Sequence, residues 1–549
     1  MGIEIRRTMN DALYNAGLLG FFNTLNQDMD DKRCHAEGDF ISFDSDDLQL
    51  FTSLYFQRLI YDFGEDTAFT QIEAERQTLL GIYEINELTT KRIMSAEKLL
   101  SDKMKRKSYL AAYDILKQKG VEFDFEGEIQ KIKGKDDLAF KRDQMIQLIE
   151  TMKIYSEIFM LKDIAYTRIQ PFWSSIAFLN KKENKSDFTE TYSKSFTAPA
   201  LSYLEELSTR VKQPKTEIVC CQCGKRITKG QSSSMSWINN EGVDVNRKTS
   251  YYWNHLPDSF LCPICNLIYS CIPLGFLSKG DESIFVNQNA SFGELVRFSS
   301  EIQGHIDEKQ TIFYKVIQTF LHATDSVSVE KEISNIQIIR RKGDHYSQHI
   351  LSKEMLSKLK KCNTNLERLV GRTVKLGEDY YQLYPEIMGM LLKNSNLYLF
   401  INKCLHYSIA DNQQAGYIKN LIETQVLYFG KGEGKMEQDL VKNGYRDGFF
   451  LRQKMLGPDR NENKIKGLSF KLVNSLKSKD QFSFIDTVLR QYLSEGSAAP
   501  KNLISVFSDE ETFLNYGYSF LTGLNSYNSA EGSDEKNEVK VKEEEMTNV

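Results

Sequence analysis

Two tetrapeptides decide how the middle of this chain folds: CCQC at residues 220–223 and CPIC at residues 262–265. In each, two cysteines stand three positions apart, so both sulfurs can hold one side of a tetrahedral zinc ion. Four thiolates leave no open position for a water nucleophile, so the site is expected to be structural. We therefore expect Cys220, Cys223, Cys262 and Cys265 to bind one structural zinc ion.

The residues around the cysteines support a metal site of unusual spacing. Gly224 can take the left-handed conformation of a tight turn, and Pro263 stiffens the second pair. The pairs are 38 residues apart, whereas a compact ribbon has about 15–20 between them. We expect the insert to form its own finger, with these packing residues: Trp237, Tyr251, Tyr252 and Trp253. Cys221 and His255 are competing ligands, Cys271 is nearby, and a redox dithiol or a metal-free relic is the alternative.

Length and composition indicate several helical domains. A chain of 549 residues exceeds one ordinary core, which predicts two to four domains. Its 9 prolines are about a third of average usage, and scarce proline favours long helices. We expect a mainly α fold with minor β (α+β), several domains, a zinc-stapled insertion and a C-terminal helical bundle.

Local patterns suggest where these parts begin and end. We expect a mostly helical N-terminal domain (1–211), a zinc-finger-like CxxC…CxxC module (212–276), an α+β middle region (277–434), a helical bundle (435–524) and an acidic disordered tail (525–549). Gly17 and Gly20 in the first helix indicate a close backbone approach, by another helix or by nucleic acid. Residues 121–125 and 283–287 alternate like strands. An apolar stripe marks a helix in the bundle: Ile465, Leu468, Leu472 and Leu476.

Charge and cysteine usage bound the compartment and the partners. The net charge of the chain is −5. Seven acids and three lysines after residue 529 contribute −4 of this charge, so residues 1–529 are nearly neutral. A nearly neutral total is compatible with a basic patch on one face. No signal peptide or membrane span is evident, and nine cysteines without a disulfide pattern fit a reducing cytosol. We expect a cytoplasmic protein without a membrane partner.

Known catalytic motifs fail when they are tested against this sequence. The glycine-rich run GKGEGKM at residues 430–436 lacks the Ser or Thr that must follow a P-loop lysine. His345 and His349 have Tyr346 where a zincin has its glutamate. We expect a protein that is not an enzyme, and an enzyme with an unfamiliar site is the remaining alternative.

An ordered set of motifs resembles the CXXC–CXXC type large subunit of a type I (I-B/I-A-like) CRISPR interference complex, Cascade. The set is LYNAGLLGF at residues 13–21, the two cysteine pairs, PLG at 273–275, FVNQN at 285–289, and the stretch from NKIKGL at 463–468 to RQY at 490–492. The resemblance implies recognition of a PAM in target double-stranded DNA, binding of the guide RNA 5′ end, R-loop stabilisation and docking of a helicase–nuclease. The implied partners also include the Cascade backbone and small subunits.

Such a role needs local basic patches. Base pairing with the guide RNA recognises most of the target sequence, and protein contacts to phosphate favour the replacement of the DNA duplex by the RNA–DNA duplex. The preferred set lies in the C-terminal bundle: Lys464, Lys466, Lys471, Lys477 and Lys479. Two weaker sets are Lys103, Lys105, Arg106 and Lys107, and Arg340, Arg341 and Lys342. For each set, the alternative is a charged surface that contacts only solvent. A zinc-ribbon nucleic-acid-binding regulator outside CRISPR is the alternative function.

Met436 follows the run KGEGK, which a purine-rich ribosome-binding sequence can encode. In related systems the small subunit is made from an internal start inside the large-subunit gene. Met436 is therefore a candidate internal translation start, and a glycine- and lysine-rich loop between domains is the alternative.

Overall fold

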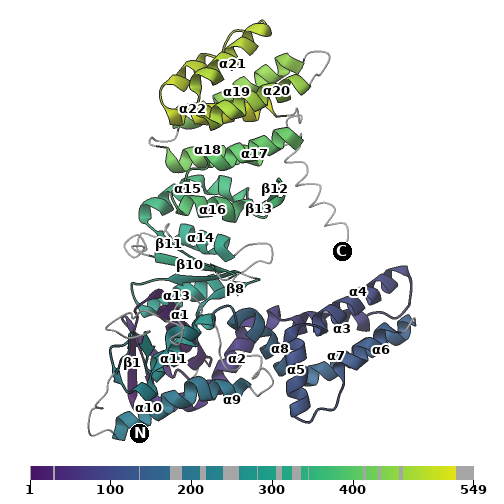
Figure 1. Ribbon diagram of the computed structural model, residues 1–549, viewed down its shortest axis with the longest axis vertical. Helices are drawn as coiled ribbons and strands as arrows, with labels where there is room; N and C mark the ends of the chain where they lie inside the picture. The colour runs from purple at the N-terminus through teal and green to yellow at the C-terminus, as the bar shows by residue number, and fades with distance from the viewer. Residues whose placement is uncertain are drawn as a thin grey trace, which may run out of the picture. The chain divides into compact units, whose positions relative to one another are not determined.

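The computed structural model describes residues 2–28, 31–134, 137–173, 188–209, 218–238, 259–280, 282–303, 312–323, 336–343, 345–411, 416–430, 435–456 and 462–526. The chain divides into two compact units: residues 1–305 with 335–348, and residues 306–334 with 349–549. Helices dominate both, and the sheets are small (Figure 1), which confirms the mainly α fold with minor β. The five-part division stays a prediction.

The first unit opens with a three-stranded antiparallel sheet and two helices. The sheet has the order β1-β3-β2. Its elements and the helices that follow are β1 (Glu4–Thr8), α1 (Ala12–Leu25), β2 (Cys34–Glu37), β3 (Phe40–Asp44) and α2 (Phe51–Phe63). Burial alternates along β1, so Ile5 and Arg7 point inward while their neighbours are exposed. The Asp11 side chain caps α1 by accepting from the Tyr14 N–H at 2.9 Å.

Helix α1 packs backbone to backbone against two short helices, α11 (Pro263–Tyr269) and α12 (Ile272–Gly275). A Cβ on Gly17 would lie 2.6 Å from the Ile268 carbonyl oxygen, and one on Gly20 2.2 Å from that of Cys271. Only glycine allows this approach at both positions. The close approach expected from the sequence is therefore made by helices of this chain.

A layer of helices forms a second core in the same unit. Its members are α3 (Ala68–Leu80), α4 (Glu87–Met104), α5 (Lys107–Gln118), α6 (Phe125–Lys133), α7 (Leu138–Ile154) and α8 (Ser156–Ile164). The strand expected at residues 121–125 is wrong, because Asp124 caps α6 by accepting from the Gly127 N–H at 3.0 Å and Phe125 begins the helix. Helices α9 (Phe188–Tyr192) and α10 (Ala198–Thr209) pack with the first core.

A four-stranded antiparallel sheet of order β11-β10-β9-β8 follows the cysteine region. Its strands are β8 (Leu277–Lys279), β9 (Glu282–Asn287), β10 (Ile336–Lys342) and β11 (His345–Leu351), and α13 (Phe292–Gln303) packs against β9. The strand predicted at residues 283–287 is confirmed within β9.

The second unit is a succession of helix pairs (Figure 1). Its elements are α14 (Ile312–Ala323), α15 (Lys353–Glu367), β12 (Thr373–Leu376), β13 (Asp379–Gln382), α16 (Leu383–Leu392), α17 (Tyr398–Asp411), α18 (Tyr417–Phe429), α19 (Lys435–Leu456), α20 (Glu462–Lys477), α21 (Gln481–Ser494) and α22 (Glu510–Leu524). All four residues of the predicted apolar stripe are buried on α20. Among the described residues, no helix is both long and apolar enough to cross a membrane.

Candidate metal centre

The four predicted zinc ligands come together in the first unit. The sulfur atoms of Cys220, Cys223, Cys262 and Cys265 all lie within 4.8 Å of one another, and the four are free thiols. Three of these side chains are buried and Cys223 is half-buried. A tetrahedral zinc ion bound by four thiolates fits such a cluster.

The first pair is presented by a turn between two short antiparallel strands, β4 (Ile218–Val219) and β5 (Arg226–Ile227). The Gly224 N–H donates to the Cys220 carbonyl at 2.9 Å, and the Cys220 N–H donates to the Lys225 carbonyl at 2.9 Å. Gly224 has φ +69°, the left-handed conformation that this turn was expected to need. The turn therefore directs both sulfurs to one side.

The second pair begins helix α11. Cys262 is the N-cap residue, Pro263 stands in the first turn, and the Cys262 sulfur accepts from the Cys265 N–H at 3.4 Å. A strand pair, β6 (Ser233–Ser234) and β7 (Phe260–Leu261), leads into this helix, and the Cys221 N–H donates to the Phe260 carbonyl at 2.9 Å. The two halves of the site are thus joined by backbone bonds as well as by the expected metal.

The thiols perturb one another strongly. Hydrogen bonds from the three other thiols lower the pKa of Cys220 far below its ordinary value. Hydrogen bonding to Cys220 raises the pKa of Cys262 and of Cys265. A metal ion must displace the protons that these two thiols hold, so its affinity falls as the pH falls.

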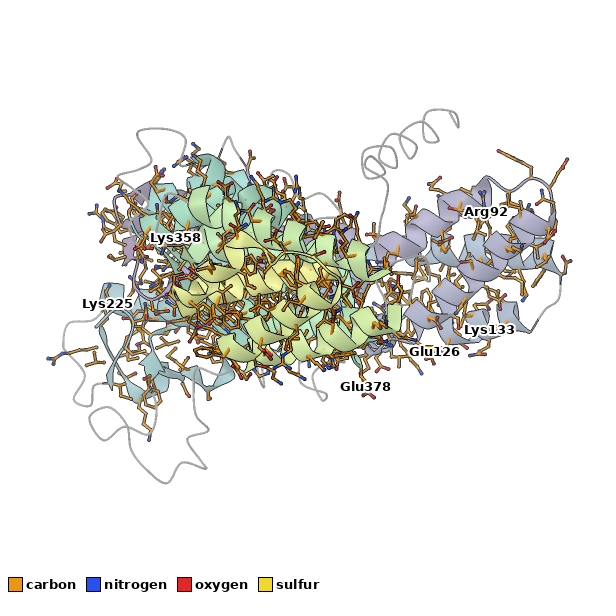
Figure 2. All side chains as sticks on the ribbon, turned by 90° about the horizontal axis from the view of Figure 1, so that it is seen from above. Arg92, Glu126, Lys133, Lys225, Lys358 and Glu378 are labelled. Atoms are coloured by element: carbon orange, nitrogen blue, oxygen red, sulfur yellow. The ribbon has the colours of Figure 1, made fainter. Side chains whose placement is uncertain are left out.

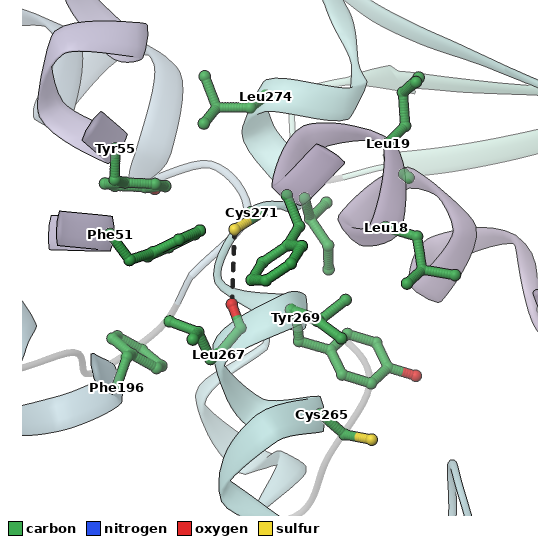
Figure 3. Packing of buried hydrophobic residues seen from close by; sticks show 14 of the residues in the cluster. Leu18, Leu19, Phe51, Tyr55, Phe196, Cys265, Leu267, Tyr269, Cys271 and Leu274 are labelled. Carbon is green, nitrogen blue, oxygen red and sulfur yellow. Dashed lines mark hydrogen bonds between the residues drawn. The ribbon is translucent and has the colours of Figure 1, made fainter. Parts of the chain in front are cut away.

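The other residues that were expected near the metal site are not part of the four-cysteine cluster or lie outside the described residues. Cys221 is exposed, and its sulfur lies 3.7 Å from the Met235 sulfur. Cys271 is packed among Phe51, Tyr55 and Leu267, and its thiol donates to the Leu267 carbonyl at 3.5 Å (Figure 3). His255 and three of the four aromatic residues expected to pack the insert (Tyr251, Tyr252 and Trp253) lie outside the described residues. Trp237, the fourth, packs edge-on against Trp173.

The surroundings of the cluster come from the N-terminal segment, which the sequence did not reveal. The Tyr14 hydroxyl lies 3.5 Å from the Cys265 sulfur. Asn10 donates to the Gln222 carbonyl at 3.4 Å, and Asp11 accepts from the Tyr269 hydroxyl at 2.9 Å. All seven residues of α11 are buried. The cysteine site is therefore part of the N-terminal core rather than a free-standing finger.

The five lysines of the C-terminal set do not form one patch. Lys464 and Lys471 are exposed and lie two turns apart on one face of α20, since seven residues rotate by about 700°. Lys477 is exposed on a different face of that helix. Lys466 donates to the Ala410 carbonyl at 2.8 Å, and Lys479 pairs with Glu510 at 2.6 Å.

The other two basic sets differ from each other. Lys105, Arg106 and Lys107 are exposed between α4 and α5. Arg341 is buried and stacks over Phe172, and Arg340 is paired with Glu282. The second set is therefore not an open basic surface. Met436 lies in the first turn of α19, and its side chain is outside the described ones.

Comparison with known proteins identifies the cysteine region. Residues 213–277 match the family described as CRISPR-associated protein (Cas_CXXC_CXXC). No curated protein and no solved structure matched the chain. The match covers both cysteine pairs, β4 to β7, α11 and α12. Residues 213–277 therefore carry the CXXC–CXXC module of a CRISPR-associated protein family, and this module supports a CRISPR-associated role for the chain.

Proposed function

We propose that this chain is the large subunit of a type I CRISPR Cascade complex. In this role it recognises the PAM in target double-stranded DNA and binds the guide RNA 5′ end. It then stabilises the R-loop and provides the docking surface for the helicase–nuclease. The observation that carries the proposal is the family match at residues 213–277, centred on the tetrathiolate cluster. The order of the other motifs along the chain supports it.

The chemistry of the metal site agrees with a subunit that has no catalytic centre of its own. Four thiolates fill a tetrahedral zinc ion, so the metal has no position at which to activate water. Its role in this proposal is to hold the N-terminal core together. Catalysis is then left to the helicase–nuclease that docks on the complex.

The alternative, a zinc-ribbon regulator outside CRISPR, is less well supported by the geometry. A ribbon that binds DNA alone needs a module that folds around its zinc. Here β4 to β7 are two residues long each, and α11 is buried against α1 and the helices beside it. This arrangement favours a metal site that stabilises the N-terminal core over a separate DNA-binding domain.

The surface that we assign to the displaced strand is the face of α20 with Lys464 and Lys471. Both are exposed, and neither forms an ion pair with a described carboxylate. On α6 of the first unit, by contrast, Lys133 and Glu126 are both exposed and lie seven residues apart, on one face of the helix (Figure 2). Lysines that are not already paired with carboxylates are available to neutralise phosphates.

The test is R-loop formation by the reconstituted complex on a supercoiled target, followed by permanganate footprinting of the displaced strand. The variant Lys464→Glu/Lys471→Glu is expected to lower R-loop yield. It should also reduce the salt slope of DNA binding by roughly one for each phosphate that the variant no longer neutralises. The matched control is Lys131→Glu/Lys133→Glu on α6, where R-loop yield should stay at the wild-type value. Equal yields for both variants would contradict this assignment, and a wild-type complex that opens no target would contradict the proposed function.

A further inference from the structure

Arg7 is a buried arginine on the N-terminal strand of the first unit. It lies on β1 opposite Ile41 of β3, and its side chain points inward like that of Ile5. Only 3% of its surface is exposed, whereas the side chain of the neighbouring Arg6 is 61% exposed and paired with Glu4. The strand therefore carries one arginine in water and one in the core.

The guanidinium of Arg7 is poorly satisfied by the protein. Nη1 donates to the Arg6 carbonyl at 2.7 Å, but Nε and Nη2 are buried and have no hydrogen-bond partner among the described residues. No described carboxylate forms an ion pair with Arg7. A charge buried in this way costs several kcal/mol unless an anion lies beside it. The fold must supply that anion from another kind of group.

The groups around Arg7 are those of the metal centre. The Cys265 and Cys262 thiols and the Tyr14 hydroxyl lie near the Arg7 guanidinium. The Tyr14 hydroxyl in turn lies 3.5 Å from the Cys265 sulfur. Tyr203 is near both the arginine and the cysteine cluster. The cysteine cluster is thus a source of negative charge near Arg7.

A filled metal site carries a charge of the opposite sign to that of Arg7. Zn²⁺ bound by four thiolates has a net charge of about −2, which is as costly to bury as the arginine unless it is compensated. Thiolate sulfurs also accept N–H hydrogen bonds, and such outer contacts orient ligands and tune a metal site. Arg7 offers one positive charge and two nitrogens, Nε and Nη2, whose N–H groups are unpaired among the described residues.

We infer that Arg7 is the counter-ion of the zinc tetrathiolate: its free N–H groups donate to cysteine sulfurs when the metal is bound. Metal binding and the docking of β1 then stabilise each other. Removal of zinc lets thiols of the cluster take up protons, which reduces the negative charge beside the buried arginine, so β1 should loosen. This inference rests on the zinc site alone and not on the assignment of the chain to Cascade.

The direct test replaces Arg7 by Met, which keeps the apolar stem and removes the charge. The full-length zinc-loaded chain is mixed with a chromogenic chelator, and the rate of zinc release is measured. Arg7→Met is expected to release zinc about 10- to 100-fold faster, as for other outer-sphere partners. Arg7→Lys keeps the charge and should restore most of the retention. Arg6→Met, on the same strand but in water, is the matched control and should match the wild type.

A second readout separates a counter-ion from a residue that merely supports the fold. Hydrogen exchange of the β1 amides is measured with and without chelator. In the wild type these amides should lose protection when zinc is removed. In metal-free Arg7→Met they should be better protected than in the metal-free wild type, because a buried charge that is only partly compensated is gone. A purely structural role predicts lower protection in both states.

Three results would overturn the inference. The first is a wild-type chain that carries no zinc. The second is Arg7→Met that retains zinc as tightly as the wild type. The third is loss of hydrogen-exchange protection of the β1 amides in zinc-bound Arg7→Met together with the same loss in zinc-bound Arg7→Lys.

Discussion

At the scale of single residues, Gly20 illustrates how closely the N-terminal helix meets the cysteine region. The carbonyl oxygen of Cys271 occupies the place that a Cβ would take on this residue. Gly467 on α20 is the opposite case, because nothing lies within 4 Å of its missing Cβ. The two glycines therefore make a matched pair in which the same substitution has opposite effects.

Gly20→Ala is expected to lower the stability of the first unit by about 1–3 kcal/mol, because the added methyl group has no room. Gly467→Ala should instead raise helix stability by roughly 0.5–1 kcal/mol. The shift of the thermal unfolding transition of each variant measures both effects. If the thermal unfolding temperature of Gly20→Ala is equal to or higher than that of the wild type, α1 does not pack as described.

The ligands of the metal site could be predicted from the sequence, but their surroundings could not. A CxxC pair is a local pattern, so Cys220 and Cys262 can be recognised as candidate metal ligands without knowledge of the fold. Tyr14 contacts Cys265, which is 251 positions away along the chain, and only the fold brings Arg7 near the same cluster. An arginine next to another arginine near a chain end gives no sign of burial. The one available signal was the alternation of Ile5 and Arg7 in a short strand.

At the scale of elements, long periodic helices were predicted well and short segments less well. The apolar stripe of α20 is buried as expected, because four turns of consistent spacing leave little choice. The alternation at residues 121–125 was outweighed by one capping residue, Asp124, which starts α6. An alternation of five residues is too short to compete with a helix that buries Phe125, Ile129 and Ile132.

Helix α22 offers a test of capping in the second unit. Asp509 is its N-cap residue and accepts from the Thr512 N–H at 2.9 Å and from the Thr512 hydroxyl at 2.7 Å. These bonds lower the pKa of Asp509 below its ordinary value of 3.8. Eleven buried residues depend on the placement of this helix.

Asp509→Ala should reduce stability by about 1 kcal/mol at neutral pH, whereas Asp509→Asn keeps the cap and should lose less. Since the folded-state pKa of Asp509 is depressed, its extra stability is present above pH 3.8 and disappears as the pH falls through the folded-state pKa. Denaturation midpoints of the three proteins between pH 7 and pH 3 check this. A gap between wild type and Asn that does not shrink on acidification would contradict it.

The start of α19 bears on the candidate internal translation start. The helix begins at Lys435, so a product starting at Met436 would retain nearly all of α19 together with α20, α21 and α22. Its helices meet at close backbone contacts: a Cβ on Gly448 would lie 1.9 Å from the Phe520 carbonyl oxygen, and one on Gly523 2.0 Å from that of Tyr445. Such a fragment would therefore have a core of its own.

The internal-start hypothesis predicts that the purified complex contains a second product of this gene, which begins at Met436 and has 114 residues. Intact mass measurement of the complex detects it. Replacing Met436 by Leu should abolish that species and leave the full-length chain. The loop interpretation predicts one mass only, and the absence of the shorter product from the wild-type complex would establish it.

At the scale of the whole molecule, the chain combines an N-terminal core that contains the four-cysteine cluster with a helical unit that bears the lysines of the C-terminal set. The family match at residues 213–277 and the cluster of four cysteines support a CRISPR-associated role, and we propose on this basis that the chain is one part of a larger assembly. Composition alone did not reveal this, because the net charge of −5 gives no hint of nucleic acid. Which residues read the PAM was not predictable, since such readers are a few polar residues on loops.

Affinity purification of the tagged full-length chain, co-expressed with the genes that neighbour its own, is the sharpest test of the assignment to Cascade. We expect co-purification of other Cascade subunits and of a short guide RNA that survives nuclease treatment. Sequencing should show that these RNAs share one common 5′ segment. Recovery of this chain alone, free of RNA and of other subunits, would contradict the assignment.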